Sequence, residues 1–464
     1  MLEETIRGLE IVEDFNFNII EDLETRKKAL SGKDYIKFVG KKISLPLIPP
    51  TLSQNILFTG GIGSGKTNGI CELVDQLLDK LGNNDVMIIF DSKGDFYNQF
   101  GNNRNPKMEV QYLSNDASNT VVWNMFKEAV VDLPSNASRR EINDALMELS
   151  SILFQPMIDR DKNNPFFTLA SKNIFYGILR VLCEKYYIPT RNPDAVTNRI
   201  IFEYSQKPVN DIVKDFTSPQ CYSELKQLVD YLGRVDSKGD FKFNDQGASV
   251  LATLRNNLLE LFKGNFVKDG KFSIRDFIIK KGCKLLFIEY DIRQGQVIAP
   301  IYKALIDFGI KEALGRHKGK RNVFFVIDEF RLLPKLEYMD AGVNFGRSLG
   351  TKFIVGIQNI LQIDEVYGNS LSRSILSGFL TTVSFRTIDY ETREYIKGIF
   401  GKRVYVYDNI SLAGGQTREQ DDVITDSDIL KLSTGQAIVC VPILTKNPIK
   451  FQFLKWEDYV KTKK

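Results

Sequence analysis

A glycine-rich stretch from Asn55 to Ile70 constrains the fold of this chain more than any other feature. A short apolar run leads into the glycines, and apolar residues at helical spacing follow them. The spacing of Gly60, four further residues, and then Gly65, Lys66 and Thr67 is that of the phosphate loop of nucleotide triphosphatases. The sequence therefore predicts a strand, a phosphate-binding loop and a helix.

Each residue type in this loop has its own physical role. Glycines let consecutive backbone N–H groups turn toward phosphate oxygens, and the helix that follows points the positive end of its dipole at the same anion. Lys66 would place a positive charge beside the β and γ phosphates, and the Thr67 hydroxyl would take one position around Mg²⁺. ATP and Mg²⁺ are thus the expected cofactors. The expected cofactor-binding residues of the loop are Gly60, Gly61, Ile62, Gly63, Ser64, Gly65, Lys66, Thr67 and Asn68.

The composition is that of a folded globular protein with more than one domain. Of its 464 residues, 43% are apolar and 26% are charged. The formal net charge is only +4, from 62 Lys and Arg against 58 Asp and Glu, which is too small to indicate nucleic-acid binding by itself. A basic surface that binds DNA must therefore be local.

The cysteines and the apolar runs of the sequence indicate in which cellular compartment the protein is expected. Five cysteines are scattered without Cys-x-x-Cys spacing, and the chain has a single histidine, which argues against a zinc site and a disulfide framework. The acidic N-terminus lacks the features of a secretory signal, and no apolar run approaches the roughly 18 residues of a membrane span. We expect a cytoplasmic protein with no integral membrane segment.

Changes in periodicity along the chain predict an α/β nucleotide-binding fold that is divided by an inserted all-helical domain. Residues 1–50 carry alternating charge and are expected to form a solvated helix and hairpin that lead into the core, with a nucleic-acid-facing arm as the alternative. Residues 51–125 would form the first part of the nucleotide-binding domain, and residues 263–464 the second part. Between them, residues 126–262 show helical periodicity.

Two apolar runs of the buried-strand type end in acidic residues. The first ends at Asp91, which would lie near the nucleotide because the carboxyl ends of parallel strands face the ligand crevice; an ordinary polar turn is the alternative. The second run, residues 323–327, is followed by Asp328 and Glu329. Asp328 would hold Mg²⁺, and Glu329 would polarise the water that attacks the γ-phosphate.

A third run, residues 352–357, ends at Gln358. Its position at a strand end predicts an amide that senses the γ-phosphate and the attacking water, with a simple strand cap as the alternative. Arg347 lies just before this run. Its guanidinium could reach the nucleotide of a neighbouring subunit, or it could bind solvent or a carboxylate.

Taken in order, these motifs resemble the coupling-protein ATPases of conjugative type IV secretion systems, within the FtsK/HerA superfamily. The resemblance spans roughly residues 40–455, and the ordered set carries it more than any single motif. The set comprises the phosphate loop, Phe90-Asp91-Ser92-Lys93-Gly94-Asp95, Asn164-Pro165-Phe166-Phe167, Asp328-Glu329-Phe330, Gly346-Arg347-Ser348, Gly356-Ile357-Gln358 and Phe385-Arg386-Thr387-Ile388-Asp389-Tyr390-Glu391-Thr392.

The resemblance implies a RecA-like P-loop fold with a mostly parallel sheet, assembled as a hexameric ring that uses ATP to move DNA. It assigns Lys66 and Thr67 to the phosphate-loop pair, Gln358 to the sensor and Arg347 to an arginine finger supplied in trans. It assigns Asp328 and Glu329 to the metal-binding and catalytic acids. Relaxosome or secretion-channel proteins are the implied partners. Because the N-terminal membrane helices of the family are missing here, a partner would recruit the protein to the inner membrane.

Other functions stay open at this point. The basic loop from Arg316 to Arg321 would track DNA phosphates if it lined a channel, but a solvated turn has the same composition. A secretion ATPase that handles protein is one alternative. A nucleotide-gated docking adaptor that recruits a DNA-processing complex is another, although an intact Glu329 argues against it.

Overall fold

The computed structural model describes most of the chain in two compact units. The described residues are 4–13, 15–20, 22–31, 35–48, 51, 54–102, 105–161, 163–218, 223–236, 240–280, 282–315, 321–409 and 415–463. The first unit comprises Met1–Met108, Arg316–Arg331 and Met339–Lys464, and the second comprises Glu109–Gly315 and Leu332–Tyr338. Of the basic loop predicted from Arg316 to Arg321, residues 316–320 lie outside the described residues.

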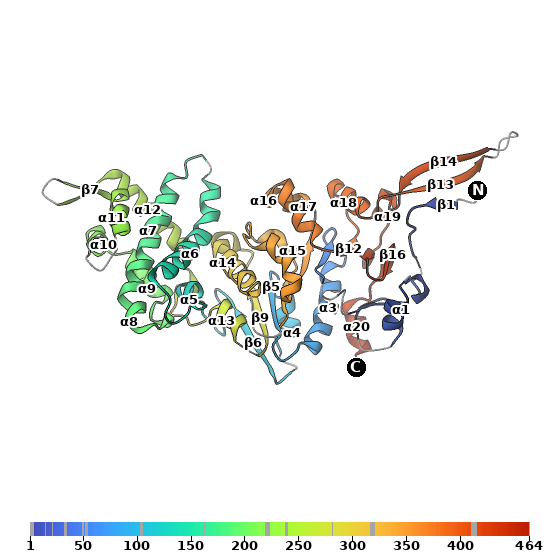
Figure 1. Ribbon diagram of the computed structural model, residues 1–464, viewed down its shortest axis with the longest axis horizontal. Helices are drawn as coiled ribbons and strands as arrows, with labels where there is room; N and C mark the ends of the chain where they lie inside the picture. Colours follow the sequence, from blue (N-terminus) through green and yellow to red (C-terminus); the bar gives the residue numbers. More distant parts are fainter. Residues whose placement is uncertain are drawn as a thin grey trace. The chain divides into compact units, whose positions relative to one another are not determined.

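Seven of the nine strands of the main sheet belong to the first unit, and Figure 1 labels β5, β12 and β16 among them. They are β4 (Ile56–Thr59), β5 (Val86–Asp91), β10 (Val323–Ile327), β11 (Thr351–Ile357), β12 (Thr381–Phe385), β15 (Gln436–Val441) and β16 (Thr445–Gln452). Their order is β16-β15-β12-β4-β11-β10-β5. The five strands from β12 to β5 are parallel, and β15 and β16 are antiparallel. The predicted mostly parallel sheet is confirmed.

The register brings the carboxyl ends of these parallel strands to one edge. Ile327 pairs with Val355 in the neighbouring strand, and the last residue of β4, Thr59, pairs with Ile357. On the other side of β4, Thr59 pairs with Ser384. The residues that follow β4, β10, β11 and β12 are therefore neighbours along this edge.

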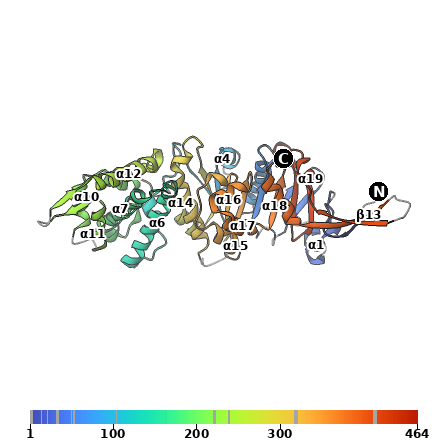
Figure 2. The same cartoon turned by 90° about the horizontal axis from the view of Figure 1, so that it is seen from above.

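The helices of the first unit are α1 (Leu23–Leu30), α3 (Lys66–Lys80), α4 (Asp95–Phe100), α15 (Met339–Leu349), α16 (Leu361–Tyr367), α17 (Asn369–Ser377), α18 (Tyr390–Phe400), α19 (Asp426–Leu430) and α20 (Trp456–Thr462). Figure 2 shows α4 on one face of the sheet and α15 and α17 on the other. Helices on both faces explain why the parallel strands are continuous apolar runs, since neither face meets water.

A buried amide just before β4 fixes the centre of the sheet. The Nδ2 atom of Asn55 donates to the carbonyl oxygens of Val343, at 2.8 Å, and Gly378, at 3.0 Å. Its Oδ1 atom accepts from the backbone N–H of Phe353 at 3.0 Å. Only 3% of Asn55 is exposed, so each of these bonds replaces one to water. One side chain thus ties three later segments to the start of β4.

The N-terminal segment forms the predicted helix and hairpin. The helix is α1, and the hairpin consists of β2 (Ile36–Val39) and β3 (Ser44–Leu47), which pair antiparallel. A second hairpin, β13 (Lys402–Asn409) with β14 (Gly415–Asp422), was not predicted. It projects from the first unit, and the first described strand, β1 (Glu4–Arg7), pairs with β13 (Figures 1 and 2).

The second unit is mainly helical. Its helices are α5 (Met125–Val130), α6 (Arg139–Arg160), α7 (Phe166–Leu182), α8 (Ile188–Thr190), α9 (Asn198–Ser205), α10 (Val209–Phe216), α11 (Ser223–Leu228), α12 (Asp245–Leu261), α13 (Ile274–Ile279) and α14 (Gly295–Ala313). Its strands are β6 (Met108–Leu113), β7 (Gly233–Val235), β8 (Phe241–Phe243) and β9 (Cys283–Glu289). Within the stretch predicted to be helical, apolar residues at helical spacing in α6 and α12 are mostly buried. The division into domains at residues 126 and 262 stays a prediction.

One helical stretch among the described residues is long and apolar enough, by length and composition, to cross a membrane. It runs from Phe166 to Thr190, and 72% of its most apolar window is buried inside the protein. The expectation that no apolar stretch reaches span length is therefore corrected here. A core helix passes the same test, and α7 packs against α6 and α12.

Candidate nucleotide-binding site

The phosphate loop joins β4 to α3 at the carboxyl edge of the sheet. Gly65, the last loop residue, has a positive φ of 116°, which side chains rarely adopt. A Cβ atom at Gly65 would also lie 3.0 Å from the Cα atom of Gly435 and 3.2 Å from the ring of Phe385. No described side chain caps the first turn of α3, so its N–H groups remain available to an anion.

Lys66 is folded onto the loop that it follows. Its Nζ atom donates to the carbonyl oxygens of Gly60, at 2.6 Å, and Gly61, at 3.0 Å. Lys66 is buried, and this burial lowers the pKa of the amine, because the charged form loses water. Asp328 and Glu329 act in the opposite direction. A phosphate oxygen in the loop would offer the amine an anionic acceptor in place of the two carbonyls.

Thr67 and Asp328 meet as the sequence predicted for a metal-binding pair. Thr67 Oγ1 donates to Asp328 Oδ2 at 2.9 Å. The other carboxylate oxygen, Oδ1, is buried without a hydrogen-bond partner among the described residues. Burial raises the pKa of Asp328, and the Thr67 hydrogen bond and the charges of Lys93 and Lys66 lower it. A hydroxyl beside an unpartnered carboxylate oxygen is a donor set that fits Mg²⁺, which takes the rest of its ligands from phosphate and water.

A glycine permits this approach. A Cβ atom at Gly356, in β11, would lie 2.3 Å from the carbonyl oxygen of Asp328 and 3.2 Å from its Oδ1. Any other residue at this position would therefore force β11 or Asp328 to shift. No group of three or more His, Cys, Asp and Glu among the described residues could hold a metal ion by side chains alone.

Glu329 and Gln358 form a second pair at the ends of neighbouring strands. Gln358 Nε2 donates to Glu329 Oε2 at 2.7 Å. Glu329 Oε1 is buried and has no hydrogen-bond partner among the described residues, although the guanidinium of Arg331 lies 3.7 Å away. One carboxylate oxygen of Glu329 therefore remains able to accept a hydrogen bond from water, as a group that polarises water requires.

Asp91 and Asn68, both predicted near the nucleotide, have structural contacts of their own. Asp91 is buried and accepts from the N–H groups of Tyr97, at 2.9 Å, and Lys93, at 3.3 Å. Burial raises its pKa. Asn68 donates to the carbonyl oxygen of Leu454 at 2.7 Å and accepts from the N–H of Trp456. Their roles in nucleotide binding stay predictions.

Arg347 lies at the opposite edge of the sheet from the phosphate loop. It is exposed near the end of α15, and its carbonyl oxygen accepts from Gly350, one residue before β11 begins. The seven residues of β11 then run parallel to β4 toward the loop, a distance of about 20 Å. Arg347 is thus too far from the phosphate loop of its own chain to contact it.

One wall of the site was not predicted from the sequence. A cavity of about 360 Å³ lies beside the phosphate loop. It is lined by Gly61, Ile62, Gly63 and Ser64 from the loop, by Arg386, Thr387 and Ile388 after β12, and by Thr434. The signal was present, because residues 386–388 follow an apolar strand, but the sequence does not show that β12 is the neighbour of β4.

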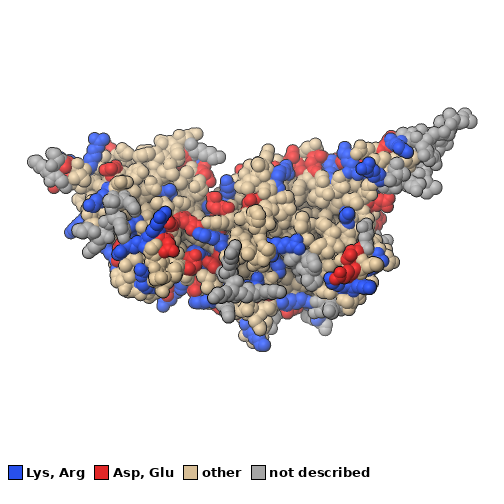
Figure 3. All heavy atoms as spheres, in the orientation of Figure 1, with Lys and Arg blue, Asp and Glu red and all other residues tan. Residues whose placement is uncertain are grey.

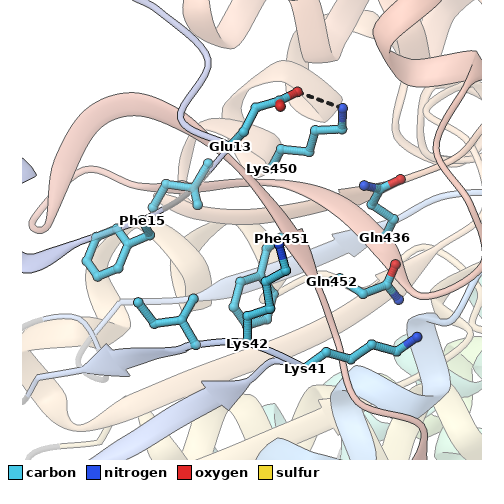
Figure 4. Close-up of a pocket in the computed structure, with 10 residues that line it drawn as sticks. Glu13, Phe15, Lys41, Lys42, Gln436, Lys450, Phe451 and Gln452 are labelled. Carbon is cyan, nitrogen blue, oxygen red and sulfur yellow. Dashed lines mark hydrogen bonds and ion pairs between the residues drawn. The ribbon is translucent and has the colours of Figure 1, made fainter.

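The turn before β15 connects this wall to a second cavity. Gly435 donates to the carbonyl oxygen of Ser64 at 2.8 Å, and Gln452 Nε2 donates to that of Thr434 at 3.3 Å. Figure 4 shows Gln452 and Gln436 at the edge of a neighbouring cavity of about 320 Å³. Three lysines, Lys41, Lys42 and Lys450, also line it, and Lys450 pairs with Glu13 at 2.9 Å.

The charged side chains on the face shown in Figure 3 are mixed in sign. Lys and Arg lie among Asp and Glu over both units rather than in one patch. This agrees with the small net charge of +4.

The sequence matches a known protein family over most of its length. A model of the type IV secretion-system coupling protein DNA-binding domain matches residues 41–187 and 191–445. Coupling protein TraD of Escherichia coli (strain K12) is 21% identical over 410 residues, which cover 86% of this chain and 50% of TraD. The chain thus spans about half the length of that relative.

Solved structures show the same fold. The bacterial conjugative coupling protein TrwBdeltaN70, in an unbound form, has a TM-score of 0.70 and 19% identity and covers 97% of this chain and 93% of its own. The plasmid coupling protein TrwB in complex with ADP and Mg²⁺ has a TM-score of 0.67 and 19% identity, with coverage of 97% and 94%. The predicted RecA-like α/β fold with a helical domain is confirmed.

Proposed function

Since this chain belongs to the family of type IV secretion-system coupling proteins, we propose that it is an ATPase that moves DNA through a ring of identical subunits. The observation that carries the proposal is that four predicted site residues meet, in two pairs, at one sheet edge. Thr67 contacts Asp328 at 2.9 Å, and Gln358 contacts Glu329 at 2.7 Å. TrwB, a neighbour in fold, has been solved with ADP and Mg²⁺, which supports the same ligands here.

Each pair would have a separate task in hydrolysis. Thr67 and Asp328 would hold Mg²⁺, which neutralises phosphate charge when it is bound. Lys66 would move its amine from the two loop carbonyls to the β and γ phosphates, at little cost because it is already desolvated. Glu329 would orient the attacking water through its unpartnered oxygen, and Gln358 would fix the plane of that carboxylate.

A ring of subunits would explain the position of Arg347. Because this arginine lies about 20 Å from its own phosphate loop, any contact with a nucleotide must be made to another subunit. Such an arginine would stabilise the charge that develops on the transferred phosphoryl group. We therefore propose that Arg347 acts in trans and that a hexamer is the active form.

DNA, and relaxosome or secretion-channel proteins, are the proposed partners. The matched family model is named for DNA binding, which supports DNA as the substrate. A cytoplasmic location, with recruitment to the inner membrane by a partner, completes the proposal.

The test is steady-state ATP hydrolysis at low salt, with no DNA, with single-stranded DNA and with duplex DNA. Wild-type protein would be compared with Lys66→Ala, Glu329→Gln and a control at an exposed lysine, Lys107→Ala. We expect DNA to stimulate hydrolysis in the wild type and the control only, and the stimulation to fade as salt rises, because phosphate contacts release counterions.

Two results would contradict the proposed DNA-moving ATPase and favour one of the alternative functions. Hydrolysis that ignores every DNA and responds to a protein substrate would indicate a protein-handling ATPase. DNA transfer that survives Glu329→Gln would indicate a docking adaptor, because hydrolysis would then not be the output.

A further inference from the structure

Three lysines line a cavity at the outer edge of the main sheet. The cavity has a volume of about 320 Å³ and lies beside β16, the edge strand. Lys41 and Lys42 come from the turn between β2 and β3, and Lys450 comes from β16. This cavity shares no lining residue with the cavity beside the phosphate loop, so the two are separate sites.

The positive charges of the cavity are only partly balanced. Lys450 pairs with Glu13 at 2.9 Å, and Glu13 is the one acid among the described lining residues. The amines of Lys41 and Lys42 are exposed and have no hydrogen-bond or ion-pair partner within the described part of the chain. Three lysines against one glutamate leave two positive charges in excess, which attract an anion into the cavity.

An amide adds a neutral donor to the same cavity. Gln436 Oε1 accepts from the backbone N–H of Ser433 at 3.2 Å, which orients the amide. Its Nε2 group has no hydrogen-bond partner among the described residues, and the side chain is half-buried. Figure 4 shows the side chains of Gln436, Gln452 and Lys41 along one side of the cavity. N–H donors of two kinds therefore face the same space.

Backbone hydrogen bonds fix the segments that carry these donors. The N–H of Lys41 donates to the carbonyl oxygen of Gln452 at 3.1 Å. The N–H of Lys450 donates to the carbonyl oxygen of Val12 at 2.9 Å. The turn between β2 and β3 and the N-terminal segment are thus both bonded to β16, so the donors are preorganised for a ligand.

The floor of the cavity is apolar. It is formed by the buried side chains of Phe15, Ile449 and Phe451. A Cβ atom at Gly40 would lie 2.7 Å from the ring of Phe451, so the turn that carries Lys41 lies directly on this floor. Apolar groups screen charge less than water does, which strengthens the attraction between the lysines and an anion.

We propose that this cavity binds a small polyphosphate of the pyrophosphate type, held by Lys41, Lys42 and the free amide group of Gln436. Lysine binds phosphate as a point charge, whereas planar recognition of a carboxylate favours arginine, and the described lining contains no arginine. The volume lies at the lower end of the range for small-molecule sites. The inference does not rest on the proposed function, because the phosphate loop takes no part in it.

The test titrates inorganic pyrophosphate into the full chain at low salt and follows binding by calorimetry. Every protein carries Lys66→Ala, so that the phosphate loop contributes little. The test variant combines Lys41→Gln with Lys42→Gln. The control combines Lys107→Gln with Lys263→Gln, at two exposed lysines outside the cavity, and has the same net charge. We expect the test variant to lose affinity by about tenfold or more and the control by less than about twofold.

Two single substitutions should change the affinity in opposite directions. Glu13→Gln removes the partner of Lys450 and frees a third amine, so pyrophosphate should bind roughly threefold more tightly. Gln436→Glu keeps the acceptor for the Ser433 N–H and adds a negative charge, so pyrophosphate should bind more weakly. A purely structural role of these side chains does not produce opposite effects on binding at equal melting temperatures.

Four outcomes would overturn the inference. They are no binding of pyrophosphate by the Lys66→Ala protein, unchanged affinity in the test variant, and equal weakening by the test variant and the control, which would show general attraction to a cationic surface. The fourth is a test variant that loses a single-stranded oligonucleotide but keeps pyrophosphate, because a DNA strand would then cover these lysines. The proposed ATPase would fail by a separate result, namely normal ATP hydrolysis by the Lys66→Ala protein.

Discussion

Gln358 donates from Nε2 to Glu329 Oε2 at 2.7 Å. They follow adjacent parallel strands, β11 and β10, so the sheet itself sets their separation. The amide holds one oxygen of the carboxylate and leaves the other without a hydrogen-bond partner among the described residues. The orientation of the Glu329 carboxylate, which is proposed to orient water, therefore depends on Gln358 as well as on β10.

Replacing this amide should affect the chemical step more than binding. We expect Gln358→Ala to lower kcat for ATP hydrolysis by roughly 100-fold, since positioned groups of this kind contribute 10²–10⁴-fold, and to change KM by much less. Steady-state kinetics would measure both, with Gln362→Ala in α16 as the control. A change in KM alone would show that Gln358 acts in binding instead.

The glycine beneath Asp328 offers a test of the metal-binding pair. Gly356→Ala would place a Cβ atom 2.3 Å from the carbonyl oxygen of Asp328, so the strand or the aspartate must shift. We expect a loss of about 1–3 kcal/mol of stability and a larger loss of Mg²⁺-dependent nucleotide affinity. Thermal unfolding and calorimetry would measure the two effects.

The matched control for that variant is Gly398→Ala in α18. A Cβ atom there meets nothing within 4 Å, so this change should stabilise the protein slightly by restricting the unfolded chain. Equal effects of the two alanines would contradict the close approach at Gly356.

A buried carboxylate in α3 predicts a pH dependence of stability. Glu72 is 1% exposed, and burial raises its pKa to about 8, although hydrogen bonds from Asn68 and Val39 oppose this. The unfolded chain loses the proton near pH 4.5, whereas the folded chain keeps it up to about pH 8. The folded state is therefore destabilised by up to about 1.4 kcal/mol for each pH unit between these values.

Removing the ionisable group should remove that slope. We expect Glu72→Gln to unfold at nearly the same temperature as the wild type at pH 5 and at a higher temperature at pH 8.5. Melting curves across this range would show it. A temperature difference that stays constant with pH would mean that Glu72 is ionised in the folded protein.

The contact between α20 and α3 predicts that the hydroxyl group of Tyr459 contributes to the stability of the folded protein. Tyr459 donates from its OH to Asp75 Oδ2 at 2.8 Å, and Asp75 is 2% exposed and also pairs with Lys463. Tyr459→Phe should lower the free energy of unfolding by about 1–3 kcal/mol, because a buried charge loses one of its partners. Denaturant titration would measure it, and Tyr186→Phe, at a tyrosine that is 44% exposed, should have no effect.

The strands and the phosphate loop were predictable because their signals are local. Continuous apolar runs predicted β5, β10 and β11, and the spacing of the loop residues predicted the start of α3. Because the carboxyl ends of parallel strands lie at one edge of the sheet, Asp328 and Gln358 could be predicted to lie near the loop without knowledge of the strand order.

The unpredicted features depend on contacts between distant parts of the chain. Asn68 stays a predicted nucleotide ligand by its place in the loop, but the bond from its amide to Leu454, 386 residues later, could not be foreseen. Ile388 could not be assigned to the loop cavity until β12 was known to lie beside β4. The β13–β14 hairpin was not predicted, because β14 is polar throughout and only β13 carries a short apolar run, residues 404–407.

The bonds made by Asn55 have a consequence for biosynthesis. This residue leaves the ribosome early, yet the backbone N–H that its side chain accepts belongs to Phe353, 298 residues later. Both neighbours of β4, namely β11 and β12, are likewise translated long after it. A nascent chain must therefore carry an apolar strand with two unpaired edges until β11 and β12 have been translated, which invites premature aggregation. Chaperone occupancy should accordingly persist until the segment that contains β12 has emerged.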